Sequence, residues 1–234
     1  MIPKKIHYCW FGGNKKPNSF NKYLKTWKKI LPDYEILEWN ENNYKTNHVF
    51  FNEMYKRKKW AFVSDYARLD ILNKEGGIYL DVDMEVVKSF NDLLKFNCFL
   101  GYEDKNLING AIIGVSKDNV FIKSCLEEYN NIKNYDLINS FTIPQIITKH
   151  LKKNGLEKYG EQEINGIKIY TEEYFYPYKK IDGFSKKCIT NNTYAIHHWN
   201  DSWGDKNIIK IISIKLTIFT KKIGIYNFLK KIYK

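Results

Sequence analysis

The sequence has few cysteines and no close pair of them. Its four cysteines, at positions 9, 98, 125 and 188, are far apart along the chain. Structural zinc sites and small disulfide scaffolds are built from closely spaced cysteines. The spacing therefore excludes a zinc knuckle and a disulfide framework, and it favours a reducing compartment.

Long apolar runs are also absent. No run of about eighteen apolar residues occurs, which is the length needed to cross a bilayer as a helix. Residues 1–5 (MIPKK) lead directly into a strand-like pattern, without the apolar region of a signal peptide. We therefore expect a cytoplasmic protein without a membrane span.

Three common catalytic motifs are missing as well. The chain contains no G-x-G-x-x-G after a strand, no Walker A sequence and no G-x-S-x-G. These absences argue against a Rossmann dinucleotide oxidoreductase, a P-loop enzyme and a serine hydrolase elbow. Metal-assisted chemistry on phosphates is the class that remains.

The composition is that of a folded and strongly basic protein. Hydrophobic residues make up 44% and aromatic residues 16% of the chain, which excludes a disordered protein. The formal net charge of +12 suggests an anionic partner such as nucleic acid, a membrane surface or a phosphorylated substrate. Lysine is scattered throughout beside asparagine and isoleucine, so compositional bias is an equal explanation.

The hydrophobic pattern predicts an α/β fold with a mostly parallel sheet. Strand-like and helix-like segments alternate, and no linker or repeat divides them. We expect strands at 5–9, 34–39, 78–80, 84–87, 97–102, 108–115, 167–176 and 194–198, and helices at 17–30, 59–75, 118–131 and 142–152. Residues 1–205 then form one domain. Residues 206–234 form a basic amphipathic helical extension, which either lies on an anionic membrane or packs on the core.

A pair of carboxylates is the most informative feature. The run Gly-Gly-Ile-Tyr-Leu-Asp-Val-Asp-Met, at 76–84, reads as a helix end followed by a short buried strand. Asp81 and Asp83 are two residues apart, so on an extended backbone they point to the same side. At the carboxyl end of a strand, such a pair suits a divalent cation shared with substrate phosphates.

Other polar or aromatic residues could join this pair. Asp65 and Arg68 lie on one helix face, either as a local ion pair or as part of the same site. His197 and His198 point to opposite faces of a strand, so only one can complete a metal shell. A structural role is the alternative for either histidine. Trp10 beside glycines can stack a nucleobase, and Asn109 beside Gly110 fits a sugar hydroxyl or a tight turn.

Taken together, three segments resemble glycosyltransferase family thirty-two. They are IPKKIHYCWFGG near the start, SDYARLDIL followed by GGIYLDVDM in the middle, and AIHHWNDSW near residue 200. Their order and spacing are similar to those of bacterial capsule and lipopolysaccharide sugar transferases and of the catalytic domains of large clostridial glucosylating toxins. The resemblance implies a GT-A fold, a nucleotide-sugar donor with UDP favoured, Mn²⁺ (or Mg²⁺) and retention of anomeric configuration.

The resemblance also implies roles for individual residues. It assigns Asp65, Arg68, Asp81, Asp83 and Asn109 to catalysis, and Asp83, His197 and Asp81 to the metal, with His198 as the alternative ligand. The residues implied to bind the donor are Trp10, Phe11, Gly12, Asp65, Arg68, Tyr79, Asp81, Val82, Ser202 and Trp203. Thr142-Ile143-Pro144 departs from the T-G-P turn of the family, which leaves the acceptor-side loop undefined.

The expected function is therefore transfer of a hexose or N-acetylhexosamine to a surface polysaccharide or lipid-linked glycan. The protein would be peripheral at the inner face of the membrane and would bind no nucleic acid. Two alternatives remain open. One is a metal-dependent phosphoesterase or nuclease that uses Asp81 and Asp83, and the other is a non-catalytic basic membrane-binding module.

Overall fold

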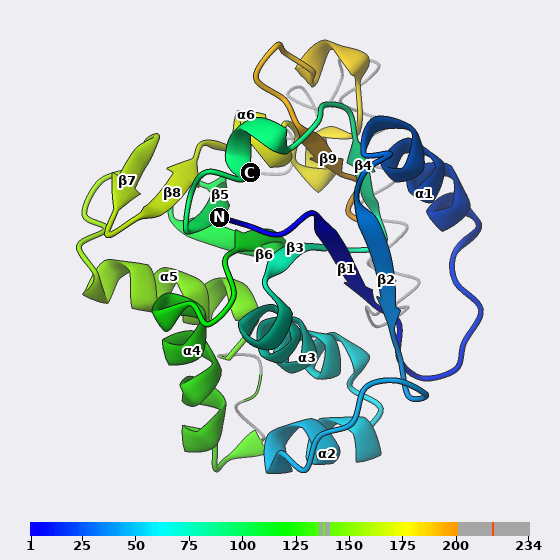
Figure 1. The fold of residues 1–234 in the computed structure, drawn as a ribbon, viewed down its shortest axis with the longest axis vertical. Helices are drawn as coiled ribbons and strands as arrows, with labels where there is room; N and C mark the ends of the chain where they lie inside the picture. Colours follow the sequence, from blue (N-terminus) through cyan, green and yellow to red (C-terminus); the bar gives the residue numbers. More distant parts are fainter. Residues whose placement is uncertain (136–137, 139–140, 201–216, 218–234) are drawn as a thin grey trace, which may run out of the picture.

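A seven-stranded mixed sheet forms the centre of the computed structural model, which describes residues 1–135, 138, 141–200 and 217 (Figure 1). The strand order is β2-β1-β3-β6-β5-β8-β7. These strands are β1 (Lys5–Cys9), β2 (Glu35–Trp39), β3 (Gly77–Leu80), β5 (Cys98–Asp104), β6 (Leu107–Val115), β7 (Gln162–Ile164) and β8 (Ile167–Tyr170). The helices are α1 (Asn18–Ile30), α2 (Val49–Lys56), α3 (Trp60–Glu75), α4 (Val120–Glu127), α5 (Ile143–Lys153) and α6 (Glu172–Phe175).

The first half of the sheet is parallel. Strand β1 pairs in parallel with β2 on one side and with β3 on the other. Helix α1 connects β1 to β2, and α2 and α3 connect β2 to β3. These are the crossover connections that parallel strands require. They place the carboxyl ends of β1 and β3 at the same edge of the sheet.

The second half contains antiparallel pairs. Strand β6 pairs antiparallel with both β3 and β5, β5 pairs parallel with β8, and β7 and β8 form a hairpin. The expected α/β fold with a mixed sheet flanked by helices is confirmed, with parallel pairing concentrated around β1.

Each face of the sheet has its own hydrophobic core. One core lies between the sheet and helices α2 to α5, and Tyr66, Leu69 and Ile146 belong to it. The other lies between the sheet and the side formed by α1, α6 and a small second sheet, and it includes Trp27, Met84 and Phe175. Figure 1 shows α2 to α5 on one side of the sheet and α1 and α6 on the other.

The small second sheet connects two distant parts of the chain. Strand β4 (Met84–Val86) pairs antiparallel with β9 (Ala195–His197). Met84 lies opposite His197 in this register, so the residues just before β4 come next to the residues just after β9. This pairing positions the candidate site.

Glycine is required where α3 turns into β3. Gly76 ends the helix at φ +64°, and Gly77 follows at φ +100°. A Cβ atom on Gly77 would lie 2.9 Å from the Lys5 carbonyl oxygen and 2.8 Å from His7 Nε2. The close approach of β1 and β3 therefore depends on the missing side chain.

Three segments differ from the expected secondary structure. The strand expected over 167–176 ends at Tyr170, and Thr171 is the N-cap residue of α6. Glu172 and Glu173 form the first turn of this helix, where their negative charges are favourable. Helix α2 and strand β7 were not expected. Both are short, and β7 is an edge strand without a buried residue, so neither has a strong periodic signal.

The expected extension over 206–234 lies outside the described residues, apart from Thr217, and the division into two regions stays a prediction. In the part of the chain that the structure describes, no helix combines the length and the apolar character needed to cross a membrane.

Candidate active site

The two carboxylates follow β3 directly. Strand β3 is buried along its whole length, and Asp81 comes one residue after its end. The prediction of an extended backbone from Asp81 to Asp83 is wrong. The chain turns here, because the Met84 N–H donates to the Asp81 carbonyl at 3.0 Å. The turn brings both carboxylates to one place and starts β4.

Asp83 is held from three directions by the chain around β9. One carboxylate oxygen lies 3.2 Å from His197 Nε2, and the other accepts a hydrogen bond from the Asn200 N–H at 2.7 Å. The Asp83 carbonyl accepts one from the His198 N–H at 3.1 Å. The side chains of Asp83 and His197 are both about nine-tenths buried.

The two histidines point in different directions. His198 Nε2 lies 2.7 Å from a Glu85 carboxylate oxygen, and its ring stacks on Tyr23 with centroids 4.7 Å apart. His197 instead faces the carboxylates. One ligand atom each from Asp81, Asp83 and His197 lie within 4.8 Å of one another. Of the two histidines, His197 is the one that the geometry brings to the carboxylates, and its role as a metal ligand stays a prediction.

This group fits a hard or borderline divalent cation. Two carboxylates and one imidazole are a donor set suited to Mn²⁺ or Mg²⁺. His197 Nδ1 is buried and has no hydrogen-bond partner among the described residues. Burial would raise the pKa of Asp83, but His197 lowers it overall. Burial would likewise lower the pKa of His197, but Asp83 raises it overall.

Arg68 connects the helix to the sheet beneath this group. Its guanidinium lies 3.0 Å from an Asp65 carboxylate oxygen and 3.3 Å from Asp81 Oδ1, and it donates to the Gly110 carbonyl at 2.7 Å. Asp65 and Arg68 are thus part of the site rather than an isolated helix pair. Burial opposes the charged form of Arg68, but Asp81 and the other neighbouring groups raise its pKa, so it stays positive.

Asp65 is as enclosed as Asp83, with about a tenth of its side chain exposed. It accepts a hydrogen bond from the Ile143 N–H at the start of α5, at 3.2 Å. Burial raises the pKa of Asp65 to about 6, against the lowering effect of Arg68. Asp81, in contrast, keeps 27% of its side chain exposed and also accepts a hydrogen bond from the Tyr79 hydroxyl at 3.0 Å. Asp81 is therefore the carboxylate that opens toward a ligand.

Asn109 lies on β6 with both ends of its amide engaged. Its Nδ2 donates to a Glu103 carboxylate oxygen at 2.6 Å, and its Oδ1 accepts from the Ala111 N–H at 2.7 Å. Glu103 was not predicted from the sequence. Burial raises its pKa, and the charge of His197 acts in the opposite direction. The sequence signal that could have identified Glu103 is its place six residues before Asn109, across a predicted β-hairpin.

The other residues assigned to donor binding lie in different surroundings. Trp10 follows β1 and is 6% exposed, and its indole N–H donates to the Asn14 carbonyl at 2.6 Å. Phe11 is fully buried against Tyr44 and Phe51, and Val82 is buried in the other core. The Gly12 N–H donates to the Glu41 carboxylate. Ser202 and Trp203 lie outside the described residues.

Two family models match successive parts of this chain. The first, described as a glycosyltransferase sugar-binding region containing a DXD motif, matches residues 17–100, and the second, an alpha 1,4-glycosyltransferase conserved region, matches residues 114–218. Asp81 and Asp83 fall within the first match, and His197 within the second. The two matches together contain the three residues that converge at the site.

Individual proteins show the same likeness. The chain is 33% identical over 152 residues to a mouse lactosylceramide 4-alpha-galactosyltransferase, a match that covers 59% of this chain and 40% of that protein. It is 33% identical over 126 residues to an uncharacterized glycosyltransferase of Acanthamoeba polyphaga mimivirus, covering 49% of each. The chain thus spans less than half the length of these relatives.

A solved structure supports the fold. The PaToxG glycosyltransferase superposes with a TM-score of 0.56 at 23% identity, covering 65% of this chain and 68% of the other. The expected GT-A fold is thereby confirmed.

Proposed function

We propose that this chain is a DXD-motif glycosyltransferase of the family thirty-two type, which transfers a sugar from a nucleotide sugar to a glycan or glycolipid. The observation that carries this proposal is the convergence of Asp81, Asp83 and His197 within 4.8 Å. The buried Arg68 lies 3.3 Å from Asp81. A metal-binding triad next to a fixed cation is the arrangement that a diphosphate leaving group requires.

In the proposed reaction, the bond between the anomeric carbon and the diphosphate breaks, and negative charge grows on the leaving group. A divalent cation, when bound by Asp81, Asp83 and His197, would supply positive charge beside that group. Mn²⁺ is our choice because the donor set includes an imidazole, which suits manganese better than magnesium.

Arg68 supplies a second positive charge that is already in position. Its contacts with Asp65 and the Gly110 carbonyl hold the guanidinium in one orientation before the substrate binds. Little reorganisation is then needed as charge develops, and this is the main advantage of a preorganised site. Asp65, with its pKa of about 6, is ionised at neutral pH and can accept hydrogen bonds from sugar hydroxyls.

Asn109 and Glu103 form the opposite wall in this proposal. With one amide N–H bonded to Glu103 and one oxygen lone pair bonded to the Ala111 N–H, Asn109 keeps its second N–H and its second lone pair for the transferred sugar. Glu103 fixes the orientation of this amide. None of these carboxylates has a position that marks it as a nucleophile, so we propose front-face transfer with retention and without a covalent intermediate.

The substrates follow from the relatives. The mouse relative is a galactosyltransferase with a lactosylceramide substrate by name, which supports transfer of a hexose to a glycan or glycolipid acceptor. UDP as the nucleotide of the donor is proposed from the family resemblance. A lipid-linked or cell-surface polysaccharide acceptor, of the capsule or lipopolysaccharide kind, remains our proposal. Trp10, Gly12, Tyr79, Ser202 and Trp203 keep their proposed roles in donor binding, and peripheral attachment through residues 206–234 at the cytoplasmic face remains part of the proposal.

The experiment is a donor screen with a metal series. The full chain is incubated with UDP- and GDP-sugars in Mn²⁺, Mg²⁺ or EDTA, and release of the nucleoside diphosphate is measured together with product mass. We expect release with at least one UDP-sugar in Mn²⁺ and none in EDTA. Cleavage of DNA or RNA without release from any nucleotide sugar would instead support a metal-dependent nuclease.

The two histidines offer a matched pair of variants. His197→Gln should remove Mn²⁺-dependent release and the shift of the melting temperature by Mn²⁺. His198→Gln changes the neighbouring residue, which faces Glu85 and Tyr23, and should retain both. An equal loss in the two variants would argue against His197 as a ligand.

A further inference from the structure

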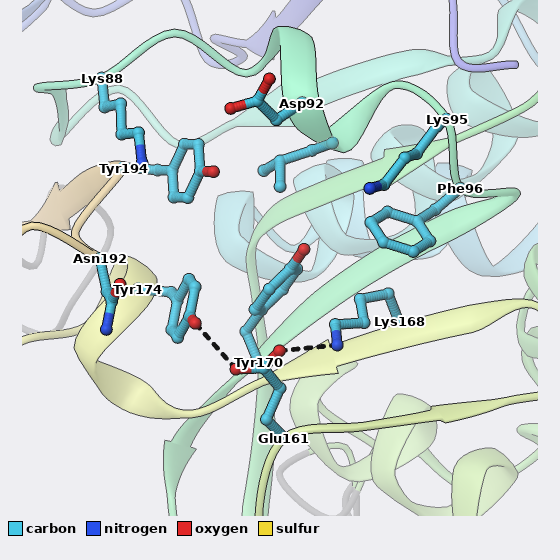
Figure 2. A pocket seen from close by; sticks show the side chains of 11 residues that line it. Lys88, Asp92, Lys95, Phe96, Glu161, Lys168, Tyr170, Tyr174, Asn192 and Tyr194 are labelled. Atoms are coloured by element: carbon cyan, nitrogen blue, oxygen red, sulfur yellow. Dashed lines mark hydrogen bonds and ion pairs between the residues drawn. The ribbon is translucent and has the colours of Figure 1, made fainter.

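A second polar pocket lies away from the candidate active site. It has a volume of about 270 Å³ and lies between the segment just before β5, strand β8 and the segment that leads into β9 (Figure 2). Its wall includes three tyrosines, at positions 170, 174 and 194, and three lysines, at positions 88, 95 and 168. The volume is below the range of roughly 300–1,000 Å³ typical of drug-sized ligand pockets, so it suits one or two sugar rings.

Three polar side chains of the pocket wall, those of Glu161, Lys168 and Tyr174, bond to one another and form a rigid floor. Glu161 accepts a hydrogen bond from the Tyr174 hydroxyl at 2.8 Å and pairs with the Lys168 ammonium at 2.7 Å. The Tyr174 ring lies 4.4 Å from the Tyr170 ring and is nearly parallel to that of Tyr194. These contacts fix the three rings before any ligand arrives.

The two other lysines of the pocket are only loosely engaged, because Lys88 donates to the Asn191 carbonyl at 3.4 Å and Lys95 lies 5.2 Å over the Phe96 ring. Among the described residues, the hydroxyls of Tyr170 and Tyr194 make no hydrogen bond, and Asp92 and Lys95 make no ion pair. Figure 2 shows the Tyr170 hydroxyl and the Lys95 ammonium directed into the pocket. Lys88 lies 4.4 Å above the Tyr194 ring, with its ammonium at the pocket wall.

The mixture of these groups identifies the class of ligand. Lys95 and Lys88 only donate hydrogen bonds, Asp92 only accepts them, and the two tyrosine hydroxyls can do both. A simple cation would be repelled by the two lysines, and a simple anion, which only accepts hydrogen bonds, would leave the Asp92 carboxylate without a donor. A polyol matches the set, because each of its hydroxyls both donates and accepts.

The two-stranded β4–β9 ribbon connects the pocket to the candidate active site. Asp83 and His197 lie at one end of the ribbon, where Met84 pairs with His197. At the other end, the N–H groups of Val87 and Lys88 donate to the Tyr194 carbonyl at 2.9 and 3.1 Å. Lys88 lies five positions after Asp83, a span of about 16 Å in an extended strand.

We propose that this pocket is a second saccharide-binding site, which holds a neutral sugar residue remote from the point of transfer. Its assignment to the acceptor glycan rests on the proposed function. The binding itself does not, because the floor of tyrosine rings and the unpaired polar groups are present whatever reaction the active site performs.

The test is a binding titration of the full chain with three neutral disaccharides, lactose, maltose and cellobiose, followed by saturation-transfer NMR and calorimetry. The pocket variant combines Tyr170→Phe with Asp92→Asn, which keeps the shape and removes one hydroxyl and one charge. Losing one hydrogen bond and the charge of a second should weaken binding about tenfold or more. Asp83→Asn, which alters the other site, should bind the same disaccharide with unchanged affinity.

Three results would overturn the proposal. They are binding of none of the disaccharides, equal affinity of the pocket variant and the unmodified chain, or displacement of the disaccharide by inorganic phosphate, which would reveal an anion site. Because this readout needs no donor, it separates failure of the pocket from failure of the transferase assignment. If both hold, the pocket variant should raise the KM for an oligosaccharide acceptor and leave donor hydrolysis unchanged.

Discussion

The pH dependence of the free energy of unfolding should report on one buried histidine, His7, which lies beneath the candidate active site. His7 lies on β1 with no exposed surface. Its Nε2 donates to the Gly76 carbonyl at 2.8 Å, and its Nδ1 accepts from the Trp39 indole N–H at 3.1 Å. Only the neutral ring with its proton on Nε2 satisfies both contacts. His7 thus supports the turn at Gly76 and Gly77, from which β3 leads to Asp81.

Burial lowers the pKa of His7 to about 4, and the charge of Lys5 adds to this effect. In the unfolded chain the pKa is the ordinary one of about 6.5. As the pH falls below about 6.5, His7 becomes protonated in the unfolded chain but stays neutral in the folded protein, so the free energy of unfolding decreases. The loss is about 2 kcal/mol between about pH 7 and pH 5, and about 3 kcal/mol once the pH is below about 4.

The assay is urea unfolding at both pH values, in the unmodified chain and in His7→Gln. The variant has no group that titrates at this position, so the difference in unfolding free energy between the two proteins should change by about 2 kcal/mol from pH 7 to pH 5. Other titrating groups, including His197, cancel in that difference. An identical pH dependence in the two proteins would refute the reasoning.

Three substitutions test other parts of the structure. Gly77→Ala should lower the free energy of unfolding by about 2–4 kcal/mol in urea, because the new Cβ would meet the backbone of β1. The control Gly13→Ala, whose Cβ would have nothing within 4 Å, should lower it by about 1 kcal/mol. Equal losses in the two variants would contradict the close approach of β1 and β3. Arg68→Met leaves buried carboxylates unpaired and should lower the free energy of unfolding by about 3–5 kcal/mol. Arg57→Met, at an exposed ion pair, should lower it by about 0.5 kcal/mol. Similar losses in the two variants would argue against a buried network. Glu103→Ala should lower the rate of sugar transfer about tenfold or more, because the Asn109 amide loses its hydrogen-bond acceptor. Glu103→Gln keeps an oxygen for that amide and should restore most of the rate. An equal loss of rate in both variants would exclude an orienting role for Glu103.

Much of the framework was predictable because its signals are local. The apolar runs of β1 and β6 and the long helix α3 were recognised from their own residues. The joint occurrence of Asp65 with Arg68 and of Asp81 with Asp83 indicated the chemistry, since these pairs are adjacent in sequence. Short elements such as α2 and β7 have few residues to carry a pattern, and they were missed.

What the sequence could not supply was the pairing of distant segments. The choice of His197 over His198 depends on the register between β4 and β9, which brings residues more than one hundred positions apart together. Glu103 meets Asn109 only because β5 and β6 form a hairpin with a shifted register. The turn after Asp81 is fixed by a backbone hydrogen bond that no residue type demands.

The central claim is that Asp83 anchors a metal ion that serves sugar transfer. The most direct measurement compares the unmodified chain with Asp83→Asn for Mn²⁺-dependent formation of a glycan product and a nucleoside diphosphate from a UDP-sugar, with circular dichroism to verify the fold. The account predicts that the folded variant loses nearly all product in Mn²⁺. Metal-dependent product formation at the unmodified rate in Asp83→Asn would contradict it.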